Sequence, residues 1–282
     1  MSRIIEFSAI VAAVEQLCGE AAVNLPEDVE AALAAAAEKE SSPLAGDFFQ
    51  QYLRNSAIAR TEGLPICQDT GVAVCFVELG AEVQVTGGLL PEAINAGVAA
   101  GYRRWFLRKS MVNDPLFDRV NTRDNTPAVI HLSIVPGDRL KIILAPKGGG
   151  SENMSALRML KPSDGRTGVV DFVVGAVVSA GGNPCPPTIV GVGIGGTMEA
   201  AALLAKRALL RPVGEPSGDI RYAELEQEIL EKINASGVGP QGLGGAVTSL
   251  AVHIEYAPCH LASLPVAVNL NCHAARHAEV IL

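Results

Sequence analysis

Three cysteines stand in loop-like surroundings that set them apart from the rest of the sequence. Cys67 lies in PICQDTG, Cys185 in GGNPCPPT and Cys272 in NLNCHAARH. The prolines around Cys185 fix the backbone and remove N–H donors, which suits a thiolate held at a defined angle better than it suits packing. The three thiols could converge on one metal centre, although spacing alone leaves open that they are unrelated.

The number of thiolates distinguishes two kinds of iron–sulfur site. An electron-transfer cluster commonly takes four cysteines, whereas three leave one iron open to bind substrate as a Lewis acid. Cys259 is the candidate fourth ligand, and its use would favour an electron-transfer protein. Cys18 and Cys75 lie in a helical and a β pattern and are expected to be structural, since buried cysteine behaves as a small hydrophobe.

An amide, a carboxylate and a hydroxyl follow Cys67 directly. Gln68 can donate hydrogen bonds to a substrate carboxylate, and Asp69 is the natural local candidate for proton transfer. Asp69 and Thr70 are the candidate catalytic residues. On local sequence alone, an Asx-type turn that caps the next strand is the simpler explanation of these residues.

An anionic substrate would need positive charge or backbone N–H groups. Arg108 in FLRKS is a candidate, and Arg103, Arg104 and Lys109 nearby leave the choice open. The run KGGGSEN supplies successive N–H groups, which bind anions when such a loop closes around them. The same run is equally explained as a mobile turn.

The elements that must position these residues alternate between helix and strand. The first forty residues predict two helices, residues 91–108 and 221–234 predict further helices, and 168–182 favours a helix over a strand. Short β-branched runs predict strands at 72–79, 81–87, 128–135, 248–257 and 264–271. We therefore expect an α/β fold of mixed sheets and helices over residues 1–282. Residues 1–60 are expected to be mostly helical and 61–282 to form the α/β cluster-binding part, as one continuous unit that can be bilobal.

The motif GVGIGG, residues 191–196, matches the G-x-G-x-x-G pattern of dinucleotide sites. A nicotinamide-dependent dehydrogenase is the corresponding alternative function. The second strand ending in an acid about twenty residues further on is missing, so a turn that packs a helix onto the sheet is the favoured interpretation. His273 and His277 have helical spacing but are not taken as a metal pair, because Cys272 is the only ligand beside them.

Composition excludes several classes of protein. A net charge of −8 over 282 residues argues against binding nucleic acid, which requires a basic surface. No run of eighteen apolar residues predicts a membrane span, and Glu6 and Glu15 interrupt the apolar amino terminus, so we expect no secretory signal. Six scattered cysteines without a CxxC pair predict reduced thiols and a cytoplasmic protein.

Five blocks of the sequence together carry a family resemblance. They are PICQDTG, DPLFDRVNTRDNTPAVIH, APKGGGSENMSALRML, NPCPPTIVGVGIGGTMEAA and CHLASLPVAVNLNCHAARH. In these blocks the chain resembles the α subunit, or the amino-terminal part, of the iron–sulfur-dependent class I fumarate hydratases and the related L-tartrate dehydratases. The resemblance implies that Cys67, Cys185 and Cys272 hold a [4Fe–4S] cluster whose fourth iron binds substrate oxygens.

The resemblance also implies roles for other residues. Gln68, Arg108, Gly150 and His260 would bind the substrate, and Asp69 would take part in proton abstraction together with a threonine of another subunit. The substrate would be a small 2-hydroxy dicarboxylate. Hydration of fumarate to (S)-malate is ranked first, and dehydration of L-tartrate is the alternative.

A second polypeptide is also expected. Only one arginine, one aspartate and one glycine loop can be assigned here, whereas binding and deprotonating a dicarboxylate needs more groups. The resemblance supplies them from a β subunit, in an α2β2-type assembly, and implies that the isolated chain is inactive. A non-catalytic assembly subunit that keeps the fold without a cluster is a further alternative.

Overall fold

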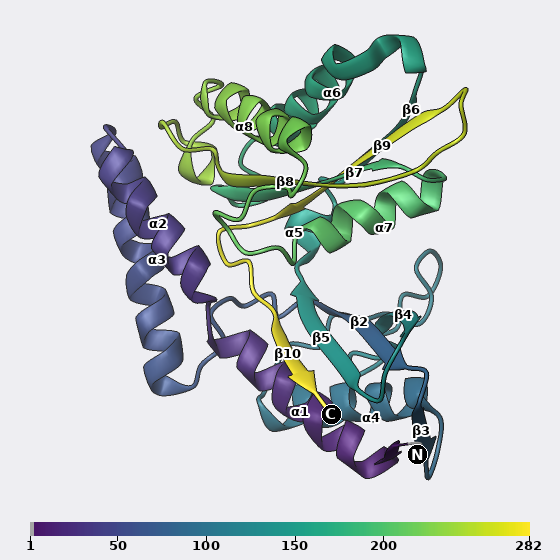
Figure 1. Cartoon of the computed structure of the whole chain (residues 1–282). Helices are drawn as coiled ribbons and strands as arrows, with labels where there is room; N and C mark the ends of the chain where they lie inside the picture. The colour runs from purple at the N-terminus through teal and green to yellow at the C-terminus, as the bar shows by residue number, and fades with distance from the viewer. Residues whose placement is uncertain (1–2) are drawn as a thin grey trace. The chain divides into compact units, whose positions relative to one another are not determined.

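The computed structural model describes residues 3–282, in which helices and short strands alternate (Figure 1). The helices are α1 (Phe7–Val23), α2 (Glu27–Lys39), α3 (Pro43–Glu62), α4 (Leu90–Arg104), α5 (Gly149–Glu152), α6 (Gly165–Ala180), α7 (Met198–Ala208) and α8 (Ile220–Asn234). The strands are β1 (Arg3–Glu6), β2 (Val72–Gly80), β3 (Val83–Thr86), β4 (Val129–Val135), β5 (Leu140–Lys147), β6 (Ala156–Leu160), β7 (Thr188–Gly195), β8 (Ser249–Ala257), β9 (Leu264–Asn271) and β10 (Ala278–Ile281). The predicted α/β fold with mixed sheets is confirmed.

The chain forms two compact units, each built from segments that are distant in the sequence. Unit 1 contains the chain up to Leu25, Ser56–Gly149 and Arg276–Leu282, and unit 2 contains Pro26–Asn55 and Gly150–Ala275. The chain therefore passes between the units four times. Each unit has its own sheet and its own hydrophobic core.

Unit 1 is built on a four-stranded sheet with the order β10-β5-β2-β4. Strand β2 pairs parallel with β4 and antiparallel with β5, and β10 pairs antiparallel with β5. A separate parallel pair joins β1 to β3. Because β2 begins at Val72, the PICQDTG loop lies at the amino-terminal end of a central strand.

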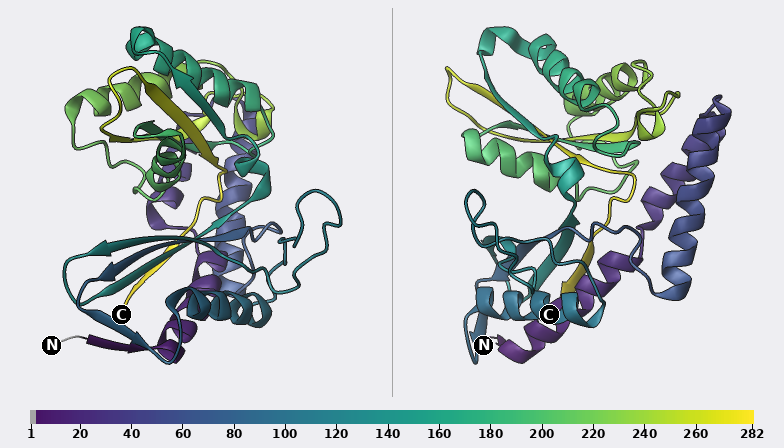
Figure 2. Two further views of the ribbon diagram at one scale, coloured as in Figure 1. Left: turned by 90° about the vertical axis from the view of Figure 1, so that its right-hand side faces the viewer. Right: turned by 180° about the vertical axis from the view of Figure 1, so that it is seen from behind.

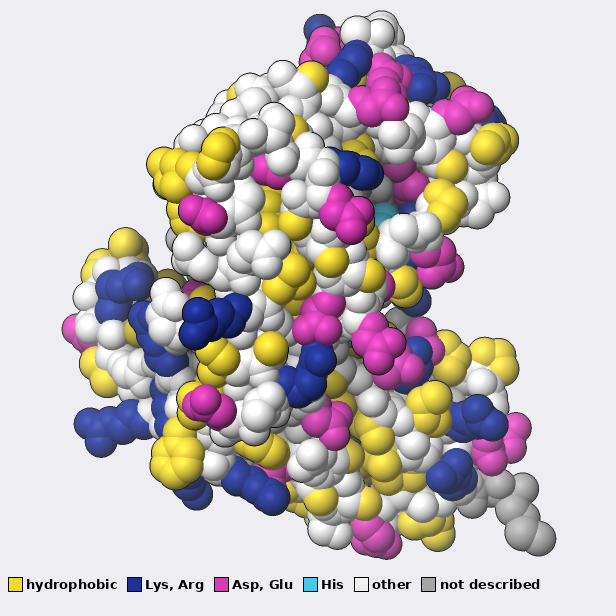
Figure 3. All heavy atoms as spheres, turned by 90° about the vertical axis from the view of Figure 1, so that its left-hand side faces the viewer, with side chains coloured by type: hydrophobic (Ala, Val, Ile, Leu, Met, Phe, Trp, Pro, Cys, Tyr) yellow, Lys and Arg dark blue, Asp and Glu magenta, His cyan; other side chains and the backbone are white. Residues whose placement is uncertain are grey.

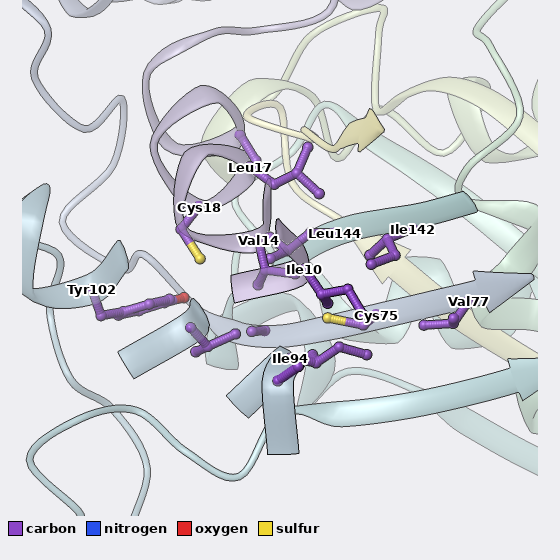
Figure 4. Close-up of a cluster of buried hydrophobic side chains, with 14 of the residues drawn as sticks. Ile10, Val14, Leu17, Cys18, Cys75, Val77, Ile94, Tyr102, Ile142 and Leu144 are labelled. Carbon is purple, nitrogen blue, oxygen red and sulfur yellow. The ribbon is translucent and has the colours of Figure 1, made fainter. Parts of the chain in front are cut away.

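Helices α1 and α4 of unit 1 pack closely because α4 has glycine, which has no side chain, at two positions of their contact. A Cβ on Gly97 would lie 2.6 Å from Val14 Cβ, and a Cβ on Gly101 would lie 2.6 Å from Cys18 Cβ. Figure 4 shows the surrounding core, to which α1, α4, β2 and β5 contribute.

Cys18 and Cys75 are 1% and 0% exposed, and burial raises the pKa of the Cys75 thiol to about 12. Both are buried in this core, as expected for structural cysteines.

Unit 2 is built on a second four-stranded sheet with the order β6-β9-β7-β8. Helices α6 and α8 cover one face of this sheet and α7 covers the other (Figures 1 and 2). Strand β7 is buried along its whole length and pairs parallel with β8 and antiparallel with β9. Residues 168–180 of the segment 168–182 lie in α6, so the preference for a helix there is confirmed.

The glycine motif of β7 serves the packing of α7. A Cβ on Gly191 would lie 2.1 Å from the carbonyl oxygen of Ala205, and a Cβ on Gly193 would lie 2.0 Å from that of Ala201. These two glycines lie inside the strand, and only Gly195 and Gly196, both with positive φ, form the turn into α7. The motif thus packs a helix onto the sheet as expected, but mainly through strand residues.

Charged side chains of both signs mix on the surface. On the face drawn in Figure 3, acidic and basic side chains are interspersed, with hydrophobic side chains between them. Within residues 3–282, none of the helices combines the length and the apolar character that crossing a membrane requires.

We expect Gly193→Ala to lower the thermal unfolding midpoint by several degrees. The added methyl group would meet the Ala201 carbonyl oxygen at 2.0 Å and force α7 away from β7. Overpacking of this kind costs about 1–3 kcal/mol. Melting followed by circular dichroism is the measurement. Gly218→Ala is the control, since a Cβ there meets no described atom within 4 Å. Equal midpoints for the two variants would contradict the close packing.

Candidate functional site

The loop that carries Cys67 connects α3 to β2 in unit 1. Ile66 anchors it: this side chain is 7% exposed, and its N–H donates to the carbonyl oxygen of Ala22 at 3.0 Å. Beyond Ile66, Gln68 is exposed and Cys67 and Asp69 are half-buried. The thiol, the amide and the carboxylate are therefore presented together on a loop whose start is fixed in the core.

The end of this loop is held by buried side chains. The Tyr102 hydroxyl, on α4, lies 2.9 Å from the carbonyl oxygens of both Thr70 and Gly71. The Asn125 side chain donates to the Gly71 carbonyl oxygen at 3.1 Å. Burial raises the pKa of Tyr102, so its hydroxyl stays protonated and can donate. Gly71 has φ +76°, and a Cβ there would lie 2.7 Å from the backbone nitrogen of Lys147, so any other residue would be strained at this position.

Both carboxylate oxygens of Asp69 accept backbone hydrogen bonds. Oδ1 accepts from the Gly71 N–H at 3.1 Å, which forms the expected Asx turn, and Oδ2 accepts from the Gly149 N–H at 2.8 Å. Arg276 donates to the Asp69 carbonyl oxygen at 3.0 Å. A carboxylate has about four lone-pair sites, so two N–H donors fix its orientation and leave capacity for a proton or a ligand.

The arginines near α4 differ in what they contact. Helix α4 ends at Arg104, so Arg108 lies in the following loop and not on the predicted helix. The Arg104 guanidinium pairs with Glu15 at 2.9 Å. The Thr70 hydroxyl, only 3% exposed as a residue, donates to the Arg108 carbonyl oxygen at 3.0 Å. Arg108 therefore has its backbone tied to the Cys67 loop and an exposed side chain.

Unit 2 brings Cys185 and Cys272 to one end of its sheet. Cys185 precedes β7, Cys272 follows β9, and the register pairs Ile189 with Asn271. The His273 N–H donates to the Cys185 carbonyl oxygen at 3.3 Å, and His273 Nδ1 lies 3.0 Å from the same oxygen. The two cysteine loops are thus hydrogen-bonded to each other.

Tyr52, on α3, contacts the residues next to this pair of cysteines. Its ring stacks on the His273 ring with centroids 4.0 Å apart, and its hydroxyl accepts a hydrogen bond from Gln241 at 2.7 Å. Burial raises the pKa of Tyr52 to about 12; the hydrogen bond from Gln241 opposes this rise, and the two nearby cysteines add to it. The cysteine pair therefore lies beside a protonated, buried tyrosine.

His260 lies at the opposite end of the same sheet. It follows β8, whose last residue, Ala257, pairs with Gly195 at the far end of β7. The eight residues of β7 span about 26 Å, so unit 2 does not bring His260 close to Cys185 and Cys272. His260 Nδ1 accepts a hydrogen bond from the Ala262 N–H at 3.1 Å instead.

Cys259 shares that distant loop, where its Sγ lies 3.3 Å from the Ser263 carbonyl oxygen. This separation argues against Cys259 as a fourth ligand beside Cys185 and Cys272. Gly150 lies nearer to the cysteine loops of unit 2, because a Cβ on it would stand 3.3 Å from the Asn183 carbonyl oxygen.

The three predicted ligand cysteines have the exposure that a thiolate-ligated group requires. Cys185 is exposed, and Cys67 and Cys272 are half-buried, whereas Cys18 and Cys75 are inaccessible. Among residues 3–282, His, Cys, Asp and Glu side chains do not gather in threes around a position for a single metal ion. Cys67 belongs to unit 1 and the other two to unit 2. The chemistry of the donors fits an iron–sulfur cluster, in which each thiolate binds a different iron.

Sequence analysis missed the residues that hold these loops. Tyr102 and Asn125 in unit 1, and Tyr52 and Gln241 in unit 2, carry no local motif. Arg276 is a partial exception, since it lies four residues after Cys272 in one of the five blocks that carry the family resemblance. The other available signals were Tyr102, the one tyrosine of the predicted helix 91–108, and Tyr52, in the segment 1–60 that was expected to be mostly helical.

Comparison with known proteins identifies the family of the chain. The family model described as fumarate hydratase (Fumerase) matches residues 11–281. A Methanocaldococcus jannaschii protein named "Putative L(+)-tartrate dehydratase subunit alpha" is 45% identical over 269 residues, which cover 94% of each chain. Proteins of Escherichia coli O157:H7 and K12 named "L(+)-tartrate dehydratase subunit alpha" are 35% and 34% identical over 263 residues, 92% of this chain and 86% of theirs. The resemblance seen in the sequence is confirmed, and the chain belongs to the fumarate hydratase (Fumerase) family of hydro-lyases.

Proposed function

We propose that this chain is the α subunit of a [4Fe–4S] hydro-lyase that interconverts a 2-hydroxy dicarboxylate and its dehydrated product. Fumarate and water giving (S)-malate is the first candidate reaction. The observation that carries the proposal is the loop in which Cys67, Gln68 and Asp69 are consecutive and accessible, and which is fixed at both ends. A cluster ligand, a substrate donor and an acid–base group would then act from one rigid segment.

Each residue in the proposal has a defined task. Cys67, Cys185 and Cys272 hold the cluster, which when bound supplies an iron without a cysteine ligand as the Lewis acid for the substrate hydroxyl. Asp69, oriented by the Gly71 and Gly149 N–H groups, takes part in moving the proton on the neighbouring carbon.

The remaining groups bind the substrate or support those that do. Gln68 and Arg108 face solvent and are available to carboxylate oxygens, and the Gly150 backbone adds to them. The Thr70 hydroxyl donates a hydrogen bond to the Arg108 carbonyl oxygen. We therefore propose that Thr70 contributes to catalysis by positioning Arg108. His260 is kept as a proposed substrate-binding residue on the resemblance alone, because within unit 2 it lies at the end of β7 opposite the cysteine pair.

L-tartrate is the second candidate substrate. The supporting observation is that relatives 34–45% identical are named as subunits of L(+)-tartrate dehydratase. Tartrate carries one hydroxyl more than malate, so the two substrates need the same acid–base groups and differ in one polar contact. The name "subunit alpha" also supports a β-subunit partner, which we propose to assemble with this chain as α2β2 in the cytoplasm.

Two alternatives have less support. An electron-transfer protein would need a fourth thiolate, and Cys259 lies at the wrong end of the sheet for that role. A nicotinamide site would need free space at the glycine motif, but Gly191 and Gly193 lie against the backbone of α7.

Activity should require both subunits and a cluster. We expect the anaerobically reconstituted chain to dehydrate neither malate nor L-tartrate alone, and to dehydrate one of them after co-expression with the proposed β subunit. Absorbance of the unsaturated product measures the malate reaction, and a coupled oxaloacetate assay measures the tartrate reaction. Full activity of the isolated chain would show that no partner is needed, and inactivity of a cluster-loaded pair on both substrates would overturn the proposed function.

Serine substitution should separate cluster ligands from other cysteines. We expect Cys67→Ser, Cys185→Ser and Cys272→Ser each to abolish the visible iron–sulfur absorbance after anaerobic reconstitution. Cys259→Ser is the matched control because Cys259 is also an exposed loop cysteine, and Cys75→Ala controls for a buried one. Loss of absorbance in Cys259→Ser equal to that in Cys185→Ser would instead favour the four-thiolate protein.

Asp69→Asn should keep the cluster and lower turnover by about two orders of magnitude or more, the scale of acid–base groups. The amide retains one acceptor for the Gly71 or Gly149 N–H, so iron content and melting temperature must be measured beside turnover. Asp219→Asn is the control, because Asp219 accepts the Arg221 N–H at 3.0 Å far from this loop in the sequence. Near-normal turnover at full iron content, or loss of iron in parallel with turnover, would contradict the catalytic role.

A further inference from the structure

We propose that Tyr52 and Gln241 are positioning residues that hold Cys185 and Cys272 at the spacing required for cluster binding. We call this pair the Tyr52–Gln241 clamp. The inference rests on the proposed function, because it concerns two of the three proposed ligands. It goes beyond that function by assigning a role to residues from α3 and from the 238–245 loop, which contain neither ligands nor substrate-binding groups.

The clamp acts first on the residue next to Cys185. The Gln241 N–H donates to the carbonyl oxygen of Pro186 at 2.9 Å, and the Gln241 side chain donates to the Tyr52 hydroxyl at 2.7 Å. The Tyr52 hydroxyl in turn donates to the same Pro186 oxygen at 3.4 Å. One carbonyl oxygen beside a proposed ligand is therefore held from two directions.

The clamp acts second on the residue next to Cys272. The Tyr52 ring stacks on the His273 ring with an interplanar angle of 19°, and His273 donates its N–H to the Cys185 carbonyl oxygen. Tyr52 is only 9% exposed, so a buried ring packs against the half-buried His273 ring. A single side chain thus contacts the neighbours of both cysteines, in loops separated by more than eighty residues.

The backbone of the Cys185 loop and that of the 238–245 loop need such support. Cys185 has φ 54° and Gln241 has φ 55°, a left-handed conformation that non-glycine residues adopt only when their surroundings fix it. The loops also touch directly, since a Cβ on Gly182 would lie 2.6 Å from the Gln241 carbonyl oxygen. Loss of the clamp should let the Cys185 loop relax toward ordinary backbone angles and move its thiol.

Tyr222 provides a matched control for this idea. It stacks on Tyr256 with centroids 4.1 Å apart and an interplanar angle of 13°, in the same unit as Tyr52. Tyr222 lies on α8, and Tyr256 lies on β8, where it pairs with Ile194 at the end of β7 away from Cys185. Removing either stack should cost stability, but only one should affect the cluster.

The experiment compares Tyr52→Leu, Tyr52→Phe and Tyr222→Leu in the co-expressed, anaerobically reconstituted complex. The decay of the visible cluster absorbance in excess iron chelator is measured, together with iron per chain and the melting temperature. We expect about tenfold faster decay for Tyr52→Leu and about threefold for Tyr52→Phe, which keeps the ring stack and loses the hydroxyl. Tyr222→Leu should decay at the wild-type rate even where its melting temperature falls as far as that of Tyr52→Leu.

Several outcomes would overturn the inference. If Tyr52→Leu and Tyr222→Leu decay equally fast, Tyr52 has only a general structural role, and the cluster assignment is unaffected. If the wild-type complex takes up no cluster, the proposed function fails and the clamp fails with it. Should Tyr52→Leu not fold, Tyr52→Phe and Gln241→Ala decide the question, and wild-type decay rates in both would refute the clamp.

Discussion

Close approach of two backbones, possible only where glycine carries no side chain, determines where the key helices lie. In unit 1, Gly97 and Gly101 let α4 rest against α1, and this contact sets the position of Tyr102 on α4. Tyr102 then holds the carbonyl groups that end the Cys67 loop. The orientation of the Cys67 loop thus depends on two glycines, Gly97 and Gly101, in the contact between α4 and α1.

Both units solve the same physical problem in the same way. Loops that present thiols to solvent cannot be stabilised by burying those thiols, so their backbone carbonyl groups are bound by a buried tyrosine hydroxyl. Tyr102 does this for Thr70 and Gly71, and Tyr52 does it for Pro186. The aromatic ring supplies buried apolar area while the hydroxyl supplies the hydrogen bond, which is why tyrosine suits this position. A rigid loop can then carry a reactive side chain without the support of a helix or strand.

Sequence patterns predicted the elements and the family better than the tertiary contacts. The α/β fold and helices α6 and α8 were predicted, and the local composition of PICQDTG already indicated the Asx turn of Asp69. Helix α4 was predicted to reach Arg108, but it ends at Arg104, where Trp105 packs against Gly19 and Phe106 has positive φ. His260 stands twelve residues before Cys272 in the sequence, yet strand β9 separates them. Sequence distance therefore misjudges separation whenever an extended strand intervenes.

The interleaving of the two units has a consequence for how the chain folds during synthesis. Strand β10 and Arg276 belong to unit 1, but the ribosome makes them only after all of unit 2. Until they emerge, strand β5 lacks its neighbour on one side and the Asp69 carbonyl oxygen lacks the Arg276 donor. Unit 2 does not depend on these last residues, because its last strand, β9, is synthesised before Arg276. The nascent chain would therefore complete its second unit before its first, and the Cys67 loop would acquire its final anchor last.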